Sequence, residues 1–131
     1  MRHQKDLSLI LARDLASHLA TPFFVVDPEG TLIFYNEPAE RVLGREFGEA
    51  GELAQEEWGT IFHPLDLDGR EIPVEQLPLS IALRERVAAH RSLLITGLDG
   101  IERTIGVTAF PLLPHPDELV GAIAIFWEET G

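Results

Sequence analysis

The stretch that decides the fold is residues 22–44, PFFVVDPEGTLIFYNEPAERVLG. Residues 23–26 and residues 31–35 are two runs of aromatic, aliphatic and β-branched side chains, which are typical of β-strands. Between them, Pro28 presets φ for a turn, and Gly30 can adopt the positive φ that a tight reversal needs. The pattern predicts two strands joined by a turn at residues 27–30.

A short helix is predicted to follow the second strand. Asn36 can accept an unpaired backbone N–H at the start of this helix, and Gly44 can end it. Pro38 is tolerated in the first turn, because N–H groups there have no partner within the helix. The apolar face of the predicted helix consists of Ala39, Val42 and Leu43.

These signals, in this order, resemble the opening of a PAS domain. The resemblance rests on a strand, Asp27-x-x-Gly30, a second strand, Asn36 and an apolar helix ending at Leu43-Gly44. Later segments resemble the middle and the last three strands of PAS domains in bacterial sensor proteins: residues 68–73, 77–79, 82–83, 99–100, 103, 111–112 and 120–123. The resemblance covers residues 18–128.

The resemblance implies an α+β chain with the PAS fold, a five-stranded antiparallel sheet with helices on one face and an N-terminal helix on the other. It divides the chain into a helix at residues 1–20 and a PAS domain at residues 21–131. It further implies a bacterial sensor module for signal transduction, as in two-component systems. Such a module regulates an output domain or a partner, for example a histidine kinase or a transcription regulator. The sequence leaves open whether this chain stands alone or is a fragment.

The N-terminal segment is predicted to form an amphipathic helix over residues 5–20. Its apolar side carries a leucine row, Leu7, Leu11, Leu15 and Leu19. This row can pack on its own domain or on a partner chain, and both arrangements remain open. Because helices in this position often couple or dimerise PAS proteins, the resemblance implies a homodimer that uses these leucines.

The last predicted strand, residues 119–128, is apolar on both of its faces. Its sequence LVGAIAIFW places aliphatic or aromatic side chains at odd and even positions alike. A strand with one face in water would alternate with polar residues. This strand is therefore expected in the middle of the sheet, with a cover on each side.

The composition excludes several classes of protein. The 131 residues include no cysteine, so disulfides and thiolate metal sites are excluded and a cytoplasmic location is expected. No apolar run approaches the roughly 20 residues that span a bilayer, so no membrane association is expected. The net charge of −12 argues against nucleic-acid binding, which requires a basic surface.

Catalytic and metal sites have weak support in the sequence. His63 and Asp66 are candidates for an acid–base pair in a small α+β enzyme, but no nucleophile or third orienting group accompanies them. Asp66, Asp68 and Glu71 are candidate calcium ligands, yet they lack the further oxygen ligands of an EF-hand loop. No enzyme and no metal site are predicted, and residues 66–69 are expected to form a surface turn.

No cofactor is predicted. Among PAS domains, flavin photo-adducts and tethered chromophores need a cysteine, and this chain has none. Haem-binding PAS domains place a proximal histidine on a helix in the region of residues 77–89. His90 falls at the end of the helix predicted there, where a cationic side chain favours the helix dipole. Flavin binding without photochemistry remains open.

The resemblance also implies a pocket between the sheet and the helices, where PAS domains bind small ligands. Strand alternation and this analogy predict its lining: Phe24, Val26, Leu83, Ile105, Val107, Ala109, Ile123 and Ile125. A ligand held there would be apolar or weakly polar. Three hypotheses remain: a module that binds a partner and a small molecule, a ligand-free dimerisation module, and the enzyme with His63 or Asp66 in a cleft.

Overall fold

The structure is a computed structural model that describes residues 20–44, 52–54, 57–58, 62–97 and 99–129. The helix expected over residues 1–20 lies, except for its last residue, outside this range. Its leucine row, Leu7, Leu11, Leu15 and Leu19, stays a prediction. Among the described helices, none is long and apolar enough to cross a membrane.

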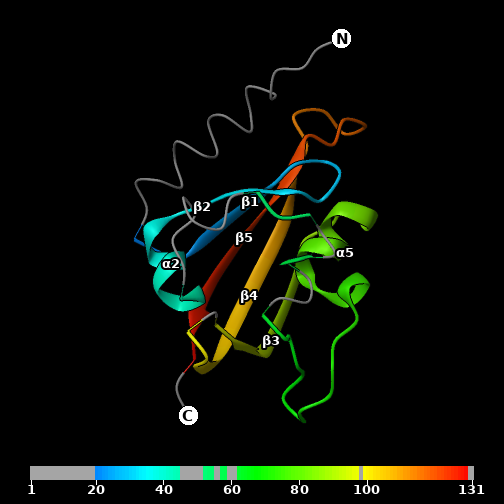
Figure 1. Cartoon of the computed structure of the whole chain (residues 1–131). Coiled ribbons are helices and arrows are strands. Elements are labelled where there is room, and N and C mark those ends of the chain that lie inside the picture. The colour runs from blue at the N-terminus through cyan, green and yellow to red at the C-terminus, as the bar shows by residue number, and fades with distance from the viewer. Residues whose placement is uncertain (1–19, 45–51, 55–56, 59–61, 98, 130–131) are drawn as a thin grey trace.

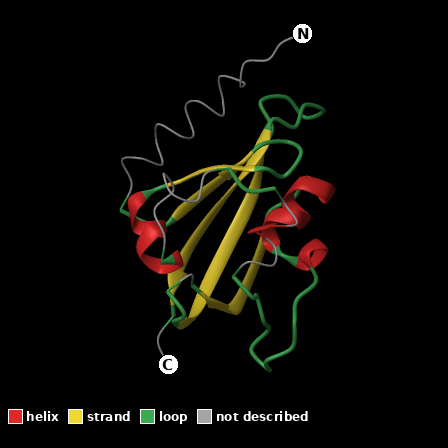
Figure 2. Ribbon diagram, viewed as in Figure 1, coloured by secondary structure: helices red, strands yellow, loops and turns green. Residues whose placement is uncertain are grey.

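Five strands form one antiparallel sheet in the order β2-β1-β5-β4-β3, which confirms the α+β prediction (Figures 1 and 2). The strands are β1 (Phe23–Val26), β2 (Leu32–Tyr35), β3 (Ala89–Thr96), β4 (Glu102–Leu112) and β5 (Gly121–Glu128). The helices that lie wholly within the described residues are α2 (Glu37–Leu43), the 3₁₀ turn η1 (Val74–Gln76) and α5 (Pro78–Glu85).

The last strand, β5, lies in the middle of the sheet, as its two apolar faces predict. It pairs with β1 on one side, where Phe24 lies opposite Ala124. On its other side it pairs with β4, where Ala109 also lies opposite Ala124. The even positions of β5 therefore share the face of Phe24, and the odd positions share the face of Phe23.

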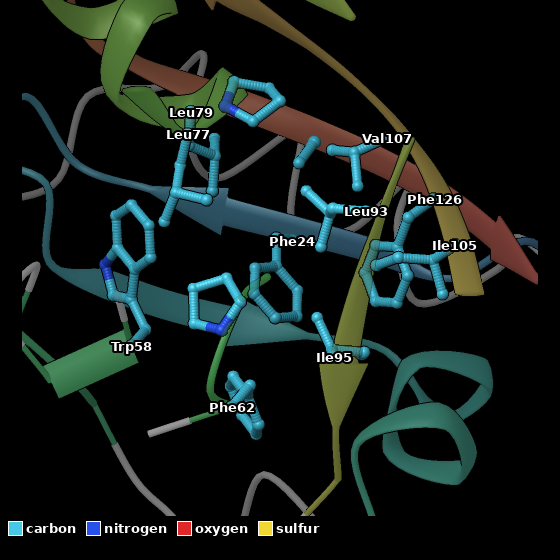
Figure 3. Close-up of a pocket in the computed structure, with 13 residues that line it drawn as sticks. Phe24, Trp58, Phe62, Leu77, Leu79, Leu93, Ile95, Ile105, Val107 and Phe126 are labelled. Carbon is cyan, nitrogen blue, oxygen red and sulfur yellow. The ribbon is translucent and has the colours of Figure 1, made fainter. Parts of the chain in front are cut away.

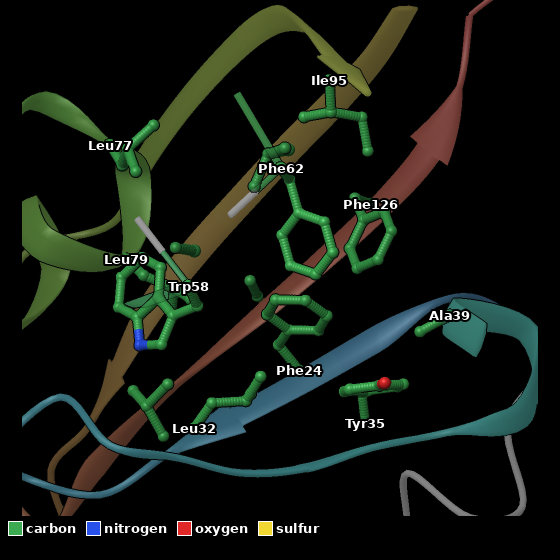
Figure 4. Packing of buried hydrophobic residues seen from close by; sticks show 14 of the residues in the cluster. Phe24, Leu32, Tyr35, Ala39, Trp58, Phe62, Leu77, Leu79, Ile95 and Phe126 are labelled. Atoms are coloured by element: carbon green, nitrogen blue, oxygen red, sulfur yellow. The ribbon is translucent and has the colours of Figure 1, made fainter. Parts of the chain in front are cut away.

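The sheet face that carries Phe24, here called the inner face, builds the main core (Figure 4). The Phe24 ring meets Phe126 edge-on at a centroid distance of 5.1 Å and lies 5.6 Å from the ring of Tyr35. Ala39 of α2 and Leu79 of α5 add to the same cluster. The two helices therefore cover one face of the sheet, as predicted.

Two boundaries differ from the sequence prediction. The helix predicted over residues 77–89 ends at Glu85, because Arg86 adopts the left-handed conformation (φ 57°) and its N–H caps the carbonyl of Ala82. Strand β3 then starts at Ala89, whereas the sequence predicts a strand only from Ser92 to Thr96. Non-glycine residues seldom end a helix in this way, so the sequence carried no stop signal. As a result His90 lies in a strand and not at a helix terminus.

Helix α2 is anchored at its C-terminus to the β3–β4 hairpin. The Arg103 guanidinium donates to the Val42 carbonyl (2.8 Å) and pairs with the Asp99 carboxylate (3.3 Å). The backbone N–H of Ile101 and then the Arg103 side chain hold the pKa of Asp99 below its usual value. This contact fixes the position of the helix over the end of the sheet.

Candidate functional site

A cavity of about 80 Å³ lies on the inner face, between the sheet and the segments that lead into α5 (Figure 3). Every described residue that lines it is apolar. The sheet contributes Phe24, Leu93, Ile95, Ile105, Val107, Ala124 and Phe126, and the covering segments contribute Trp58, Phe62, Pro64, Leu77, Pro78 and Leu79. The cavity can therefore attract a ligand through dispersion and burial of apolar surface, and no titratable side chain lines it among the residues that the structure describes.

The one polar side-chain atom on the cavity lining is directed elsewhere. Trp58 is buried, and its indole N–H donates to the carbonyl of Gly30 at 2.6 Å. This bond ties Trp58 to the β1–β2 turn and satisfies the indole N–H. The indole carbons are left to form part of the cavity wall, so Trp58 contributes packing to the site.

Six of the eight predicted pocket residues lie on the inner side, in three different positions. Phe24, Ile105 and Val107 line the cavity. Val26 and Ala109 are buried in the same core without lining the cavity. Leu83 packs against this core and lines a separate surface hollow beside Pro28 and Val74.

Ile123 and Ile125 were assigned to the wrong face. They pair with Val25 and Phe23, and all four side chains lie on the opposite, outer face of the sheet. The cavity is lined from β5 by Ala124 and Phe126 instead. Strand alternation alone could not show this, because both faces of β5 are apolar.

Sequence reasoning also missed the residues that close the cavity from the helical side. Trp58 lies in helical backbone, where its N–H donates to the Ala54 carbonyl at 3.0 Å, and Phe62 and Pro64 come from the irregular segment before Leu65. No periodicity predicts where these short segments pack. Leu77 and Leu79 flank the start of α5, and their apolar side chains were the only sequence feature that could have indicated a place in the cavity lining. Leu93 and Ile95 belong to β3, where strict alternation could have placed them beside Ile105.

The enzyme hypothesis gains no support from the geometry around His63 and Asp66. His63 is exposed on a loop, with a positive φ of 48°. The Asp66 carboxylate accepts the N–H groups of Asp68 (2.9 Å) and Arg70 (3.0 Å) and so closes its own turn. These bonds, with that of Arg70 the larger cause, lower the pKa of Asp66. Neither residue lines the cavity.

The structure also bears on the metal and haem hypotheses. In the described part of the chain, no three acidic or histidine side chains are grouped so that they could hold a metal ion. His90 lies on the outer face, where its ring stacks on Trp127 with a centroid distance of 5.9 Å. The sheet separates His90 from the cavity, so it cannot ligate a group bound there.

The outer face carries a second apolar cluster. Phe23, Val25, Ile33 and Ile123 are buried in it, and Phe34, Phe110, Leu112 and Ile125 are partly buried beside them. Val25 has no exposed surface at all. The sheet is therefore apolar on both faces, as the sequence of β5 predicted.

Comparison with known proteins identifies the family of this chain. A model described as PAS domain matches residues 11–78, just over half of the chain. Among curated proteins, none matches. The PAS domain of BvgS from Bordetella pertussis is similar in structure (TM-score 0.63, 18% identity, 95% of this chain and 87% of that chain).

Two further solved structures resemble this fold. The LOV protein of Rhodobacter sphaeroides aligns with a TM-score of 0.68 and 16% identity, over 89% of this chain and 64% of that chain. The PAS domain of nitrogen regulation protein NR(II) from Vibrio parahaemolyticus aligns with a TM-score of 0.62 and 13% identity, over 91% and 98%. At sequence identities of 13–18%, the similarity to these three structures shows a shared fold alone.

Proposed function

The chain belongs to the PAS domain family, and we propose that it is a non-catalytic sensory module of a bacterial signalling protein in the cytoplasm. In this proposal a small apolar molecule binds in the inner-face cavity. The homodimeric module then regulates an output domain or a partner, such as a histidine kinase or a transcription regulator. The observation that carries the proposal is the cavity between the sheet and α5, whose described lining residues are all apolar.

The size of the cavity limits the ligand. Pockets for drug-sized ligands enclose about 300–1,000 Å³, whereas this cavity measures about 80 Å³. An apolar cavity of about 150 Å³ in another protein stays dry and binds benzene or xenon. The ligand is therefore expected to be a molecule of a few non-hydrogen atoms, held without hydrogen bonds from the lining side chains.

Xenon is the probe for this cavity. Under xenon pressure, the methyl resonances of Leu93, Ile105 and Val107 are expected to shift, because xenon fills apolar voids. Ala124→Leu extends a side chain into the cavity and is expected to abolish these shifts. Ile125→Leu, on the outer face of the same strand, is the matched control and should preserve them.

Native mass spectrometry of the purified chain tests the ligand itself. The proposal expects a retained small molecule that is lost in Ala124→Leu and kept in Ile125→Leu. If no molecule is retained and xenon leaves the methyl resonances unshifted, the cavity is only a packing defect. The module would then be the ligand-free dimerisation domain of the second hypothesis.

The outer-face cluster favours a dimer, with or without a ligand. Phe110, Leu112 and Ile125 remain partly exposed beside the buried Val25 and Ile123. Contiguous apolar surface of this kind marks an interaction site more often than isolated exposed residues do. The predicted leucine row of the N-terminal helix could share this interface.

Sedimentation equilibrium tests the dimer. Phe110→Glu places a charge in the outer-face cluster and is expected to convert a dimer into a monomer, because burying an unpaired carboxylate is costly. Leu67→Glu is the control, since Leu67 is 60% exposed on a loop. A wild-type chain that sediments as a monomer, or a Phe110→Glu variant that remains dimeric, would contradict a dimer through this face.

A further inference from the structure

Strand β3 is an edge of the sheet, and a neighbouring loop segment already pairs with half of its free side. Leu94 exchanges both backbone bonds with Leu65, at 2.8 and 2.9 Å. The N–H of Thr96 donates to the carbonyl of Phe62 at 2.8 Å. These bonds show that the even-numbered residues of β3 direct their backbone groups away from β4.

The same alternation leaves backbone groups of His90 and Ser92 directed outward. In the register of the sheet, His90 lies opposite Thr108 and Ser92 opposite Gly106, so both are non-hydrogen-bonded pairs. Side chains approach closely in such pairs, and the 3.0 Å contact between His90 Nδ1 and Thr108 Oγ1 agrees with this. Within the described residues, neither His90 nor Ser92 has a backbone hydrogen-bond partner on the edge of β3 that faces away from β4.

The segment that leads into β3 is rich in arginine, although the chain as a whole carries a net charge of −12, and Arg91 lies within β3 itself. Arg84, Arg86 and Arg91 fall within eight residues, with Glu85 the only acid among them. Arg84 pairs with Glu85 at 3.0 Å. In the described part of the chain, no ion pair engages Arg86 or Arg91.

Arg91 is also close to one carboxylate of its own chain. Its charge contributes to the lowered pKa of Asp66, although the backbone N–H of Arg70 is the main cause. The Oδ1 of Asp66 accepts two N–H groups from its own turn, and no ion pair within 4.0 Å joins Asp66 to Arg91 among the described residues. An incoming carboxylate could complete the coordination of this guanidinium.

We propose that the edge of β3 at His90 and Ser92 binds an extended acidic segment of a partner protein as an added strand. The outward N–H and C=O groups supply the backbone bonds, as in other cases of strand addition. Arg91, which lies between His90 and Ser92 on the strand and has no ion pair among the described residues, selects an acidic partner. A second copy of this chain is disfavoured as the occupant, because its own Arg91 would bring a like charge to this edge.

The alternation of the strand also specifies the partner sequence. Side chains opposite Arg91 lie on the inner side and should be acidic. Partner side chains opposite His90 and Ser92 would lie on the outer face of the sheet, where the stacked rings of His90 and Trp127 offer apolar surface. An alternating peptide, acetyl-VEVEV-amide, therefore matches both requirements and serves as the probe.

The experiment is an NMR titration of the full chain with acetyl-VEVEV-amide. The amides of His90 and Ser92 are expected to shift and to exchange more slowly with solvent, because they become hydrogen-bonded. Acetyl-VKVKV-amide should bind at least about tenfold more weakly, since each lysine meets like charge. Arg91→Gln should weaken binding of the acidic probe, and Arg41→Gln, at an exposed position on α2, should leave binding unchanged.

Ser92→Pro removes one outward N–H without removing any β3–β4 bond, and edge strands tolerate proline at such positions. Loss of one backbone bond should reduce the affinity about fivefold. If this variant does not fold, the probe with its central valine N-methylated makes the same test from the peptide side. The proposal is overturned if VKVKV binds as well as VEVEV, if the shifts map away from β3, or if the chain self-associates through this edge.

Discussion

Replacing Asn36 with alanine is expected to lower the free energy of unfolding by about 3–5 kcal/mol, because it leaves buried backbone groups without partners. Asn36 is 2% exposed. Its Oδ1 accepts the N–H groups of Phe23 (3.1 Å) and Ala39 (3.2 Å), and its Nδ2 donates to the carbonyl of Thr21 (2.8 Å). Urea unfolding followed by circular dichroism measures the loss.

Two variants serve as controls for this prediction. Asp27 also accepts two backbone N–H groups, from Glu29 and Thr31, but its bonds are exposed or only partly buried. Asp27→Ala should therefore cost about 1 kcal/mol. Asn36→Asp keeps the acceptor oxygen and removes the N–H donor to the Thr21 carbonyl. Its loss of unfolding free energy should therefore lie between those of Asn36→Ala and Asp27→Ala. Equal losses for Asn36→Ala and Asp27→Ala would show that burial of these bonds is not decisive.

Asn36 also shows how far the sequence could predict the fold. Its position after an apolar run predicted a helix cap, and the bond from Ala39 confirms it. The bonds to Phe23 and Thr21 span 13 and 15 residues, so no local pattern could indicate them. Turns, caps and strand composition are local properties, and they were enough to predict the order of the elements in residues 22–44.

The candidate site was less predictable, because its geometry depends on which face each strand presents. In β5 the alternating sets are Ala122, Ala124 and Phe126 on one face and Ile123 and Ile125 on the other, and both sets are apolar. Hydrophobicity could not separate them. The deciding factor is volume, since the small Ala124 leaves room for the cavity and the ring of Phe24 beside it.

Glycine at position 44 is expected to be nearly irreplaceable, and Gly44→Ala should cost about 3–4 kcal/mol in unfolding free energy. The left-handed conformation (φ +81°) alone costs an alanine roughly 1–2 kcal/mol. In addition, a Cβ on Gly44 would lie 2.6 Å from the backbone nitrogen of Asp99 and 2.8 Å from its Cγ. The hairpin would have to move away from α2, which strains the bond between Arg103 and Val42.

Gly100→Ala is the matched control for this prediction. Gly100 has the same φ of +81°, but a Cβ there would meet no atom within 4 Å. Gly100→Ala should therefore lower the free energy of unfolding only by the cost of placing an alanine in the left-handed conformation, about 1–2 kcal/mol. The difference between the two variants, measured by urea unfolding, isolates the contact between α2 and the β3–β4 hairpin.

Hydrogen exchange locates the effect of Gly44→Ala within the molecule. The N–H of Gly44 donates to the carbonyl of Glu40 at 2.8 Å, so exchange in α2 reports on the end of the helix. Faster exchange in α2 and at Arg103, with β1 and β5 unchanged, is expected because the contact joins only the helix and the hairpin. Equal stability losses in Gly44→Ala and Gly100→Ala would mean that the hairpin moves aside freely and does not fix the position of α2.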